Sequence, residues 1–433
     1  MTTKLFAVTG RPALHSKSPL LFAGAYPGSP HAYFRLAARS PGEALRLFEE
    51  LDLSGMNVTA PFKTDIARLI DQRSPEVQLL GAANTVTRDP LGRLRAHNTD
   101  PLGVDGALAA AGVDPRDKTC IVLGAGGAGT AAAHALQRAG ARVTVLNRNV
   151  DKARALAARL SCAHAPLDSP SLIAAADVIV NTLPPGVEIV REEWLSARQV
   201  ILDALYRGSA LREQAARRRA AYIDGMQWLL HQGAPAYRLF AGVEPNLDGM
   251  EQALRDQPPL PRHIAFVGFM GAGKSTAARA LAGKLGLALA DSDKIIEQQN
   301  GKSIPRQIQE DGEASFREQE EKTLRALLLA NSPTIISCGG GAVNNPETRA
   351  LLRARALVIW LHASTEQCLR RINIASRPLL ARSDDPRQAA AEIYRTRKHL
   401  YASVADLLVD TSGRTSEQVN QIIHEEINTC IRG

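Results

Sequence analysis

The chain has 433 residues, of which 45% are hydrophobic and 22% charged, a balance typical of globular domains and not of disordered or fibrous proteins. At about 150 residues per domain, this length predicts two to four domains. The net charge of +8 divides evenly on either side of Pro261 and forms no polybasic tail, which argues against nucleic-acid binding and suits an enzyme of small anionic substrates.

The sequence also indicates a compartment. No apolar run approaches the roughly 18 residues of a membrane span, and the first residues contain no sustained apolar segment of a signal peptide. The five cysteines are scattered and form no CxxC pair, which is typical of a reducing environment. We therefore expect a cytoplasmic protein with no membrane partner, and nothing indicates an obligate protein partner.

Strands and helices alternate along the chain. Strands are expected at 5–8, 33–36, 55–58, 120–123, 142–146, 178–181 and 200–202, and helices at 42–51, 100–112 and 130–139. The segment 118–146 reads as a complete βαβ unit. The pattern predicts an α/β fold throughout.

The first hundred residues contain three polar segments, each at or near the end of an expected strand. They read HSKSP at 15–19, NVTAPFK at 57–63, and NT at 84–85 with NTD at 98–100. Ligand crevices of open α/β sheets gather at such strand ends. A lysine with an aspartate partner, such as Lys63 with Asp100, can supply the proton that a carbonyl oxygen needs when a hydride reaches its carbon. Taken singly, each segment is more typical of a cap or a turn.

A glycine-rich loop follows the strand at 120–123. The loop reads GAGGAG at 124–129 and matches the GxGxxG pattern. The residues expected to contact the cofactor are Gly124, Gly126, Gly127, Ala128 and Gly129. Glycines here allow a tight turn and a close approach of the backbone to a pyrophosphate, so within a βαβ unit the loop predicts dinucleotide binding.

The end of the next strand indicates which dinucleotide. An NAD site places a carboxylate there, whereas this chain has Asn147, Arg148 and Asn149, with Lys152 one turn later. A guanidinium and an ammonium can contact a 2′-phosphate. The cofactor is therefore predicted to be NADP(H).

Together, these motifs over residues 4–255 closely resemble the shikimate dehydrogenase family. The resemblance implies that Lys63 and Asp100 are the catalytic pair and that Asn57 helps to shape the pocket. The shikimate ligands that it implies are Ser16, Ser18, Thr59, Asn84, Tyr206 and Gln232. It also implies a substrate domain at 1–100 plus 225–256 and a Rossmann NADP-binding domain at 101–224.

Three segments depart from the family pattern. Pro101 replaces the glycine that commonly follows NTD, residues 181–186 read NTLPPG, and Trp228 brings bulk where the family has a small residue. The last two bear on how the nicotinamide is positioned, and none of the three removes the catalytic pair.

Residues 257–261 contain three prolines and are predicted to be a stiff linker before a P-loop kinase domain at 262–433. A full GxxxxGK[ST] loop follows the strand that begins near 264. The loop and the start of its helix include Gly271, Ala272, Gly273, Lys274, Ser275 and Thr276. Backbone N–H groups of such a loop hold phosphates, while the lysine reaches the β/γ oxygens and the serine the Mg²⁺. The cofactor is a nucleoside triphosphate, and the loop alone leaves the phosphoryl acceptor open.

Downstream residues suggest a pocket for an anionic acceptor. Two carboxylates, Asp291 and Asp293, follow an apolar strand, and arginines lie near the glycine run 339–341 and further on. These segments, in this order over 262–430, closely resemble the shikimate kinase family. The resemblance implies a shikimate site of Asp293, Arg317, Gly340, Gly341 and Arg397. It implies Ser275 and Asp291 for magnesium, Arg377 for the nucleotide phosphates, and Arg370 and Arg414 beside the adenine.

The two motif sets predict successive reactions in one chain. 3-Dehydroshikimate is reduced with NADPH to shikimate, which ATP then phosphorylates at the 3-hydroxyl, with Asp293 and Arg377 as the catalytic residues of the second step. Two alternatives stay open: a kinase fused to a catalytically silent dehydrogenase-like module, and a dehydrogenase that prefers quinate.

Overall fold

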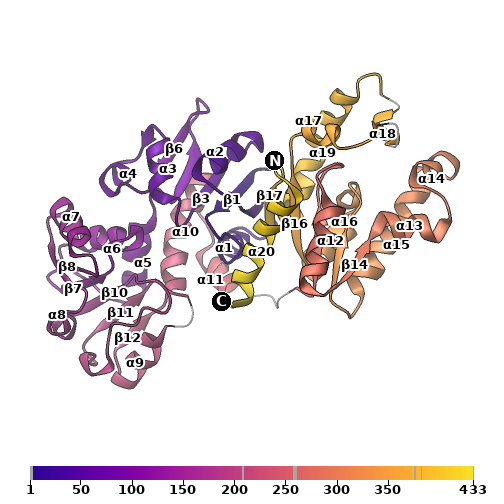
Figure 1. The fold of residues 1–433 in the computed structure, drawn as a ribbon. Helices are drawn as coiled ribbons and strands as arrows, with labels where there is room; N and C mark the ends of the chain where they lie inside the picture. Colours follow the sequence, from indigo (N-terminus) through magenta and orange to yellow (C-terminus); the bar gives the residue numbers. More distant parts are fainter. Residues whose placement is uncertain (1–2, 207–208, 257–260, 375–376, 382, 433) are drawn as a thin grey trace. The chain divides into compact units, whose positions relative to one another are not determined.

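The computed structural model describes residues 3–206, 209–256, 261–374, 377–381 and 383–432, and it divides into two compact units (Figure 1). The first unit contains residues 1–19, 29–60 and 258–433, and the second contains residues 20–28 and 61–257. Apart from Pro261, the predicted linker lies outside the described residues. The first unit thus groups residues 1–19 and 29–60 with the P-loop segment, whereas the sequence assigns them to a substrate domain. The predicted domain boundaries stay a prediction.

The first unit contains a parallel sheet with the strand order β14-β15-β13-β16-β17-β2-β1-β3. Its strands are β1 (Leu5–Thr9), β2 (Ala32–Leu36), β3 (Gly55–Val58), β13 (His263–Val267), β14 (Ala288–Asp291), β15 (Thr334–Ser337), β16 (Ala356–His362) and β17 (Leu407–Asp410). Its helices are α2 (Pro41–Glu50), α12 (Lys274–Leu285), α13 (Ser292–Asn300), α14 (Ile304–Glu310), α15 (Glu313–Leu329), α16 (Pro346–Arg355), α17 (Thr365–Arg370), α18 (Pro378–Ala381), α19 (Pro386–Val404) and α20 (Ser416–Arg432), with a 3₁₀ turn at Ala342–Asn344.

The pairing of β17 with β2 joins the two ends of the chain within this unit. Leu407 pairs with Arg35 and Leu408 with Leu36. The core shows the same continuity, because Leu14 and Ala37 belong to one buried cluster with Phe266, Ile359 and other residues of the P-loop segment. Residues 1–19 and 29–60 therefore share a unit, with its sheet and core, with the P-loop segment.

The second unit contains a six-stranded parallel sheet with the order β12-β11-β10-β7-β8-β9, and a small group in which β6 pairs antiparallel with β5 and parallel with β4. Its strands are β4 (Gln72–Arg73), β5 (Thr85–Arg88), β6 (Leu94–His97), β7 (Thr119–Leu123), β8 (Arg142–Asn147), β9 (Ala163–Pro166), β10 (Val178–Asn181), β11 (Val200–Asp203) and β12 (Ala221–Ile223). Its helices are α3 (Lys63–Leu69), α4 (Pro75–Leu80), α5 (Asp100–Ala110), α6 (Gly127–Arg138), α7 (Val150–Leu160), α8 (Pro170–Ala175), α9 (Ala210–Arg218), α10 (Gly225–Ala241) and α11 (Leu247–Arg255), together with most of α1 (Ser18–Ala25) and a 3₁₀ turn at Glu192–Trp194.

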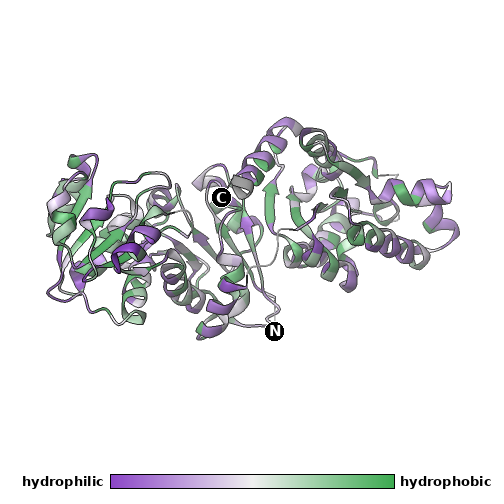
Figure 2. Ribbon diagram, turned by 90° about the horizontal axis from the view of Figure 1, so that it is seen from below, coloured by the Kyte–Doolittle hydropathy of each residue, from purple (hydrophilic) through white to green (hydrophobic). Residues whose placement is uncertain are grey.

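Figure 2 shows that the strands are predominantly hydrophobic and that the helices alternate between hydrophobic and hydrophilic residues, as burial of one helix face requires. The predicted α/β class is confirmed, and each predicted strand is present to within one or two residues. Helix α6 begins at Gly127, three residues earlier than predicted, because the glycine loop itself forms its first turn. No helix among the described residues is long and apolar enough to cross a membrane.

Candidate active sites

A cavity of about 390 Å³ lies in the first unit at the end of β13. It is lined by the P-loop residues 270–277 and by residues from later segments, which include Asp293, Ser337, Gly340, Arg371, Arg377, Thr411 and Arg414. The first N–H groups of a helix have no intrahelical partner and attract anions. Since the N-terminus of α12 borders the cavity, the cavity can receive phosphate groups.

Lys274 provides the cation at this helix end. Its Nζ donates to the carbonyl oxygens of Gly268 at 2.9 Å and Phe269 at 3.0 Å. Burial lowers the pKa of Lys274, and the negative charge of Asp293 opposes that shift. The hydroxyl of Ser275 lies 3.1 Å from that of Ser337, so hydroxyl oxygens and an ammonium share the same cavity wall.

Asp293 is an unusual carboxylate. Burial and the charge of Glu320 together raise its pKa to about 6, although Lys274 acts in the opposite direction. A Cβ placed on Gly339 would lie only 2.6 Å from Asp293 Oδ1 and 2.4 Å from Glu320 Oε1, so only glycine allows the backbone this close to the two carboxyl groups. A base with a pKa near neutrality is suited to accept a proton.

The glycine run is fixed by three further side chains. Tyr401 Oη donates to Gly340 O at 2.6 Å, and Arg397 Nη1 donates to the same oxygen at 3.3 Å. Arg317 Nη1 donates to Glu320 at 2.7 Å, and it would lie 2.3 Å from a Cβ on Gly341. Two arginines therefore adjoin the carboxylate and the exposed backbone of the run, a combination suited to a hydroxylated anion.

In the second unit, Lys63 and Asp100 stand at the N-termini of α3 and α5. Lys63 Nζ lies 2.6 Å from Asp100 Oδ2, and both side chains are largely shielded from solvent. Trp228 Nε1 donates to the backbone oxygen of Asp100 at 3.0 Å. The carboxylate thus fixes the position of the ammonium group.

Asn84 links this pair to α10. Its Nδ2 donates to Asp100 Oδ1 at 2.8 Å and to Gln232 Oε1 at 3.1 Å, while its Oδ1 accepts the N–H of Thr99 at 2.8 Å. Burial raises the pKa of Tyr206 to about 12, and the charge of Asp100 contributes. The polar groups predicted from four separate segments therefore form one network in this unit.

The first unit holds the other predicted polar groups. Ser16 Oγ donates to Ser18 Oγ at 3.2 Å, and Tyr33 Oη donates to Asn57 Oδ1 at 2.7 Å. Thr59 follows β3, and a Cβ on Gly10 would lie 2.3 Å from its methyl group. Ser16 lies on the loop that follows β1 and Ser18 begins α1, whereas Asn57 and Thr59 lie at the carboxyl end of β3 and Tyr33 lies near the start of β2.

The glycine loop of the second unit has the geometry that a dinucleotide needs. Gly124 has φ of +108°, and a Cβ on Gly129 would lie 2.0 Å from the Gly124 oxygen, so neither position accepts a side chain. Nothing lies within 4 Å of a Cβ built on Gly126, which leaves the loop open on that side. A Cβ on Gly127 would lie 3.9 Å from Lys63 Cδ, which brings the loop beside the lysine.

The polar residues at the end of β8 are of two kinds: asparagines that make hydrogen bonds within the protein, and cations whose side chains are exposed. Asn147 Oδ1 accepts the N–H of Ala125 at 3.3 Å, and Asn149 Oδ1 caps α7 by accepting the N–H of Lys152 at 3.1 Å. The side chains of Arg148 and Lys152 are exposed and, among the described residues, make no hydrogen bond or ion pair. Both cations are therefore available to a ligand.

Comparison with known proteins assigns both parts of the chain. Family models match at residues 8–86 (shikimate dehydrogenase substrate binding domain), 107–201 (shikimate / quinate 5-dehydrogenase) and 270–428 (shikimate kinase). The NADP(+) shikimate dehydrogenase of Methanothrix thermoacetophila is 33% identical over 264 residues, which cover 58% of this chain and 97% of that protein. That of Thermus thermophilus is 37% identical over 265 residues, with 58% and 97% covered.

The chain belongs to the shikimate dehydrogenase family and carries a shikimate kinase domain. Solved structures agree for the dehydrogenase part. The shikimate dehydrogenase of Aquifex aeolicus matches with a TM-score of 0.55 and 32% identity, covering 59% of this chain and 98% of that one. The Thermus thermophilus enzyme in complex with NADP(H) and shikimate matches with a TM-score of 0.53 and 35% identity, covering 58% and 99%.

The departures of this shikimate dehydrogenase part from the family pattern have structural explanations. Pro101 lies in the first turn of α5, where a missing N–H costs no hydrogen bond. Trp228 is buried and supports Asp100 through its indole N–H. Thr182 Oγ1 donates to the oxygen of Leu123 at 2.7 Å, directly beneath Gly124, so the NTLPPG segment still supports the loop.

In the shikimate kinase domain the structure places some predicted residues outside the cavity wall. Asp291, predicted for magnesium, caps α13 by accepting the N–H of Lys294 at 3.3 Å and does not line the cavity. Arg370 forms an exposed pair with Glu366. The neighbouring Arg371 lines the cavity instead and donates to Thr411 Oγ1 at 3.0 Å. The sequence did not single out Arg371 or Tyr33 as site residues, and the helical periodicity of α17 was the signal that could have separated Arg371 from Arg370.

Proposed function

We propose that this chain reduces 3-dehydroshikimate to shikimate with NADPH and phosphorylates shikimate with ATP. The observation that best supports this proposal is that each part of the chain contains both a nucleotide-binding loop and a positioned proton-transfer group. In the first reaction this group is Lys63, held by Asp100 at 2.6 Å beside the glycine loop. In the second it is Asp293, held beside the P-loop.

For the reduction, NADPH supplies a hydride to the carbonyl carbon of the substrate. Lys63 donates a proton to the carbonyl oxygen as the C=O bond becomes a C–O–H group, and a proton from solvent restores Lys63 afterwards. Asp100 holds the Lys63 ammonium in position for this transfer. Arg148 and Lys152 meet the 2′-phosphate, which favours NADP(H) over NAD(H).

For the phosphorylation, the acceptor hydroxyl loses its proton to Asp293 while its oxygen bonds to the γ-phosphorus and the bond to the β–γ bridging oxygen breaks. Lys274, Arg377 and the N-terminus of α12 stabilise the charge on the phosphates. The hydroxyls of Ser275 and Ser337 are hard oxygen donors in the same cavity and would suit Mg²⁺, which neutralises phosphate charge when bound. The sequence-based assignment of Asp291 to the metal stays a proposal, with Asp291 acting from the N-terminus of α13.

The test follows both products from one sample. Purified full-length protein is mixed with 3-dehydroshikimate, NADPH and Mg-ATP, and NADPH loss is recorded together with shikimate 3-phosphate formation. We expect both. Kinase activity on added shikimate without NADPH oxidation would favour the silent-module alternative, and faster NADP⁺ reduction with quinate than with shikimate would favour a quinate dehydrogenase.

A further inference from the structure

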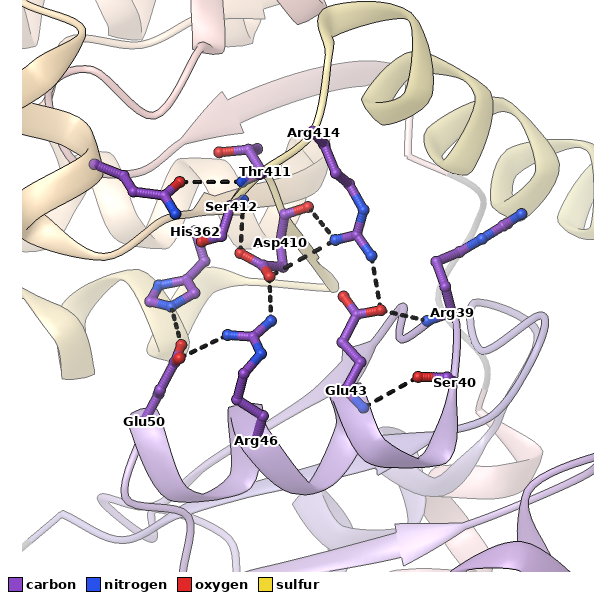
Figure 3. Close-up of polar contacts among 12 residues, drawn as sticks. Arg39, Ser40, Glu43, Arg46, Glu50, His362, Asp410, Thr411, Ser412 and Arg414 are labelled. Carbon is purple, nitrogen blue, oxygen red and sulfur yellow. Dashed lines mark hydrogen bonds and ion pairs between the residues drawn. The ribbon is translucent and has the colours of Figure 1, made fainter.

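Helix α2 comes from the dehydrogenase part of the chain, yet one of its side chains contacts an arginine that lines the kinase cavity. Glu43 Oε2 accepts a hydrogen bond from Arg414 Nη2 at 2.7 Å (Figure 3). The Glu43 side chain is 9% exposed and that of Arg414 17%, so water screens this ion pair only weakly. Arg414 lines the cavity that contains Lys274 and Ser275.

The Glu43 carboxylate is held by the start of its own helix. Ser40 Oγ accepts the N–H of Glu43 at 3.2 Å, and Glu43 Oε2 accepts the N–H of Arg39 at 2.9 Å. The pattern is close to a capping box, in which a serine and a glutamate three residues apart satisfy N–H groups at a helix start. Glu43 therefore offers its carboxylate to Arg414 from a fixed position.

Arg414 is also held from its other side. Its Nη1 donates to the backbone oxygen of Asp410, the last residue of β17, at 2.7 Å. The carboxylate of Asp410 is almost completely buried and pairs with Arg46, the next α2 residue on this face (Figure 3). Of the α2 side chains, Glu43 therefore fixes Arg414, and Arg46 fixes Asp410 at the end of β17.

The same α2 face continues away from the cavity. Glu50 pairs with Arg46 at 2.6 Å and lies 3.5 Å from His362 Nε2. The adjacent turn is tied to the cavity by Arg371, whose Nη2 donates to the oxygen of Thr411 at 2.8 Å. Residues 407–414 are thus held by β2 at their start and by α2 at their end.

We propose that Glu43 is a positioning residue for the ATP site of the kinase domain, acting through Arg414. An unrestrained arginine loses rotamer freedom when it binds a ligand, and a residue that restrains it beforehand reduces this cost. The inference rests on the proposed kinase function and adds that the nucleotide site is completed by the dehydrogenase part of the chain.

The test uses Glu43→Gln in the full-length protein, with Glu425→Gln as the matched control. Glu425 forms ion pairs with Arg11 and Arg39, so the control also removes ionic contacts between the N-terminal segment and α20, without touching Arg414. We expect Glu43→Gln to raise the KM for ATP about three- to tenfold, as for the loss of one charge-assisted contact, with kcat and the KM for shikimate changed less than about twofold. Glu425→Gln should stay within about twofold of the parent in every constant.

A double-mutant cycle tests whether the effect of Glu43 on ATP binding passes through Arg414. If Glu43 acts through Arg414, Glu43→Gln combined with Arg414→Ala binds ATP no more weakly than Arg414→Ala alone. Glu43→Asp keeps the charge but retracts the carboxylate by one methylene, and it should also raise the KM for ATP. Dehydrogenase turnover checks folding of every variant.

A parental ATP KM in both Glu43→Gln and Glu43→Asp overturns the inference. Equal increases in Glu43→Gln and Glu425→Gln also overturn it, since a loosened interface would explain them. Calorimetric binding of ATP to each variant keeps this test separate from the proposed function. If the parent binds ATP but does not phosphorylate shikimate, the proposed function fails, whereas the effect of Glu43 on ATP affinity is still measured.

Discussion

Lys63 is the residue on which the proposed reduction depends most. Its ammonium lies 2.6 Å from Asp100 and beside the glycine loop, where a carbonyl oxygen would need a proton. Lys63→Ala should lower dehydrogenase kcat by about 10²–10⁴-fold, the range for loss of a positioned general acid. The kinase rate of the same protein serves as the control and should stay at its parental value. Unchanged NADPH oxidation in Lys63→Ala would remove Lys63 from the mechanism.

Asp293 predicts a pH dependence of the kinase. Burial and the charge of Glu320 raise its pKa to about 6, so the carboxylate that accepts the proton is present above pH 6 and is lost as the pH falls below it. The kcat/KM for shikimate should therefore decline below about pH 6, whereas NADPH-dependent reduction need not follow. Asp293→Asn should lower phosphorylation by about 10²-fold and abolish this inflection.

The same pKa shift affects stability in the opposite direction. Because the folded-state pKa of Asp293 is raised above its unfolded value of 3.8, its ionisation opposes folding above about pH 6, and this cost disappears as the pH falls toward 4. At neutral pH, Asp293→Asn should be at least as stable as the parent in thermal unfolding. A large loss of stability would mean that its low activity reflects misfolding, not the missing base.

Arg148 tests cofactor selection. It is exposed at the end of β8 and has no partner among the described residues, so a 2′-phosphate can contact it without displacing another group. Arg148→Ala should weaken NADPH about ten- to a hundredfold, from a charge-assisted contact of about 1.5–3 kcal/mol, and weaken NADH much less. Binding titrations with both cofactors check this, and equal losses would assign Arg148 a structural role.

Among individual residues, side chains that belong to sequence motifs were predictable, whereas side chains that act through partners distant in the sequence were not. The Lys63 and Asp100 pair follows from two motifs whose residues have a chemical reason to meet. Nothing in the segment around Glu43 indicates Arg414, because 371 positions separate the two residues and only the fold brings them together. The family resemblance assigns Asp291 to the metal, and this stays a prediction; the structure adds that its carboxylate caps α13, an ordinary function of an aspartate at a helix start.

At the scale of elements, α20 of the kinase domain supports a loop of the dehydrogenase part. Glu426 Oε2 accepts the N–H groups of Ala13 and Leu14, both at 2.8 Å, and the Glu426 side chain is buried. The loop continues to Ser16, whose backbone oxygen accepts two hydrogen bonds from Arg35. One acidic residue of the last helix therefore fixes the start of a segment predicted to bind shikimate.

We expect Glu426→Ala to raise the dehydrogenase KM for shikimate several-fold and to lower the melting temperature, because two buried N–H groups lose their acceptor at about 1–3 kcal/mol each. Glu417→Ala, an exposed position on the same helix, is the control. The NADP⁺ KM of Glu426→Ala should stay near its parental value. If the shikimate KM does not change, the loop keeps its conformation without α20.

Elements were predictable where their own residues determine them. Apolar runs were sufficient for the strands that were predicted, such as β1, β7 and β10, and Ser40 with Pro41 marks the start of α2. The pairing of β2 with β17 was not predictable, since a strand's sequence shows that it is buried and not which strand it pairs with. The sequence therefore did not indicate that one compact unit combines segments from both ends of the chain.

At the scale of the whole molecule, the three-proline linker suggests two separable enzymes, and the β2–β17 pairing changes what separation should do. A fragment of residues 261–433 would expose the edge of β17, where Leu407 and Leu408 are fully buried in the intact chain, and it would lack Glu43. We expect it to phosphorylate shikimate with a raised KM for ATP, to melt at a lower temperature and to aggregate more readily, since an unpaired apolar edge strand recruits other chains.

A fragment of residues 1–257 would lose Glu426 and should reduce 3-dehydroshikimate with a raised substrate KM. Mixing the two fragments should restore part of both constants in a concentration-dependent manner, because association then supplies what the covalent chain provides. Parental constants and melting temperatures in both isolated fragments would show that the shared sheet has no functional effect.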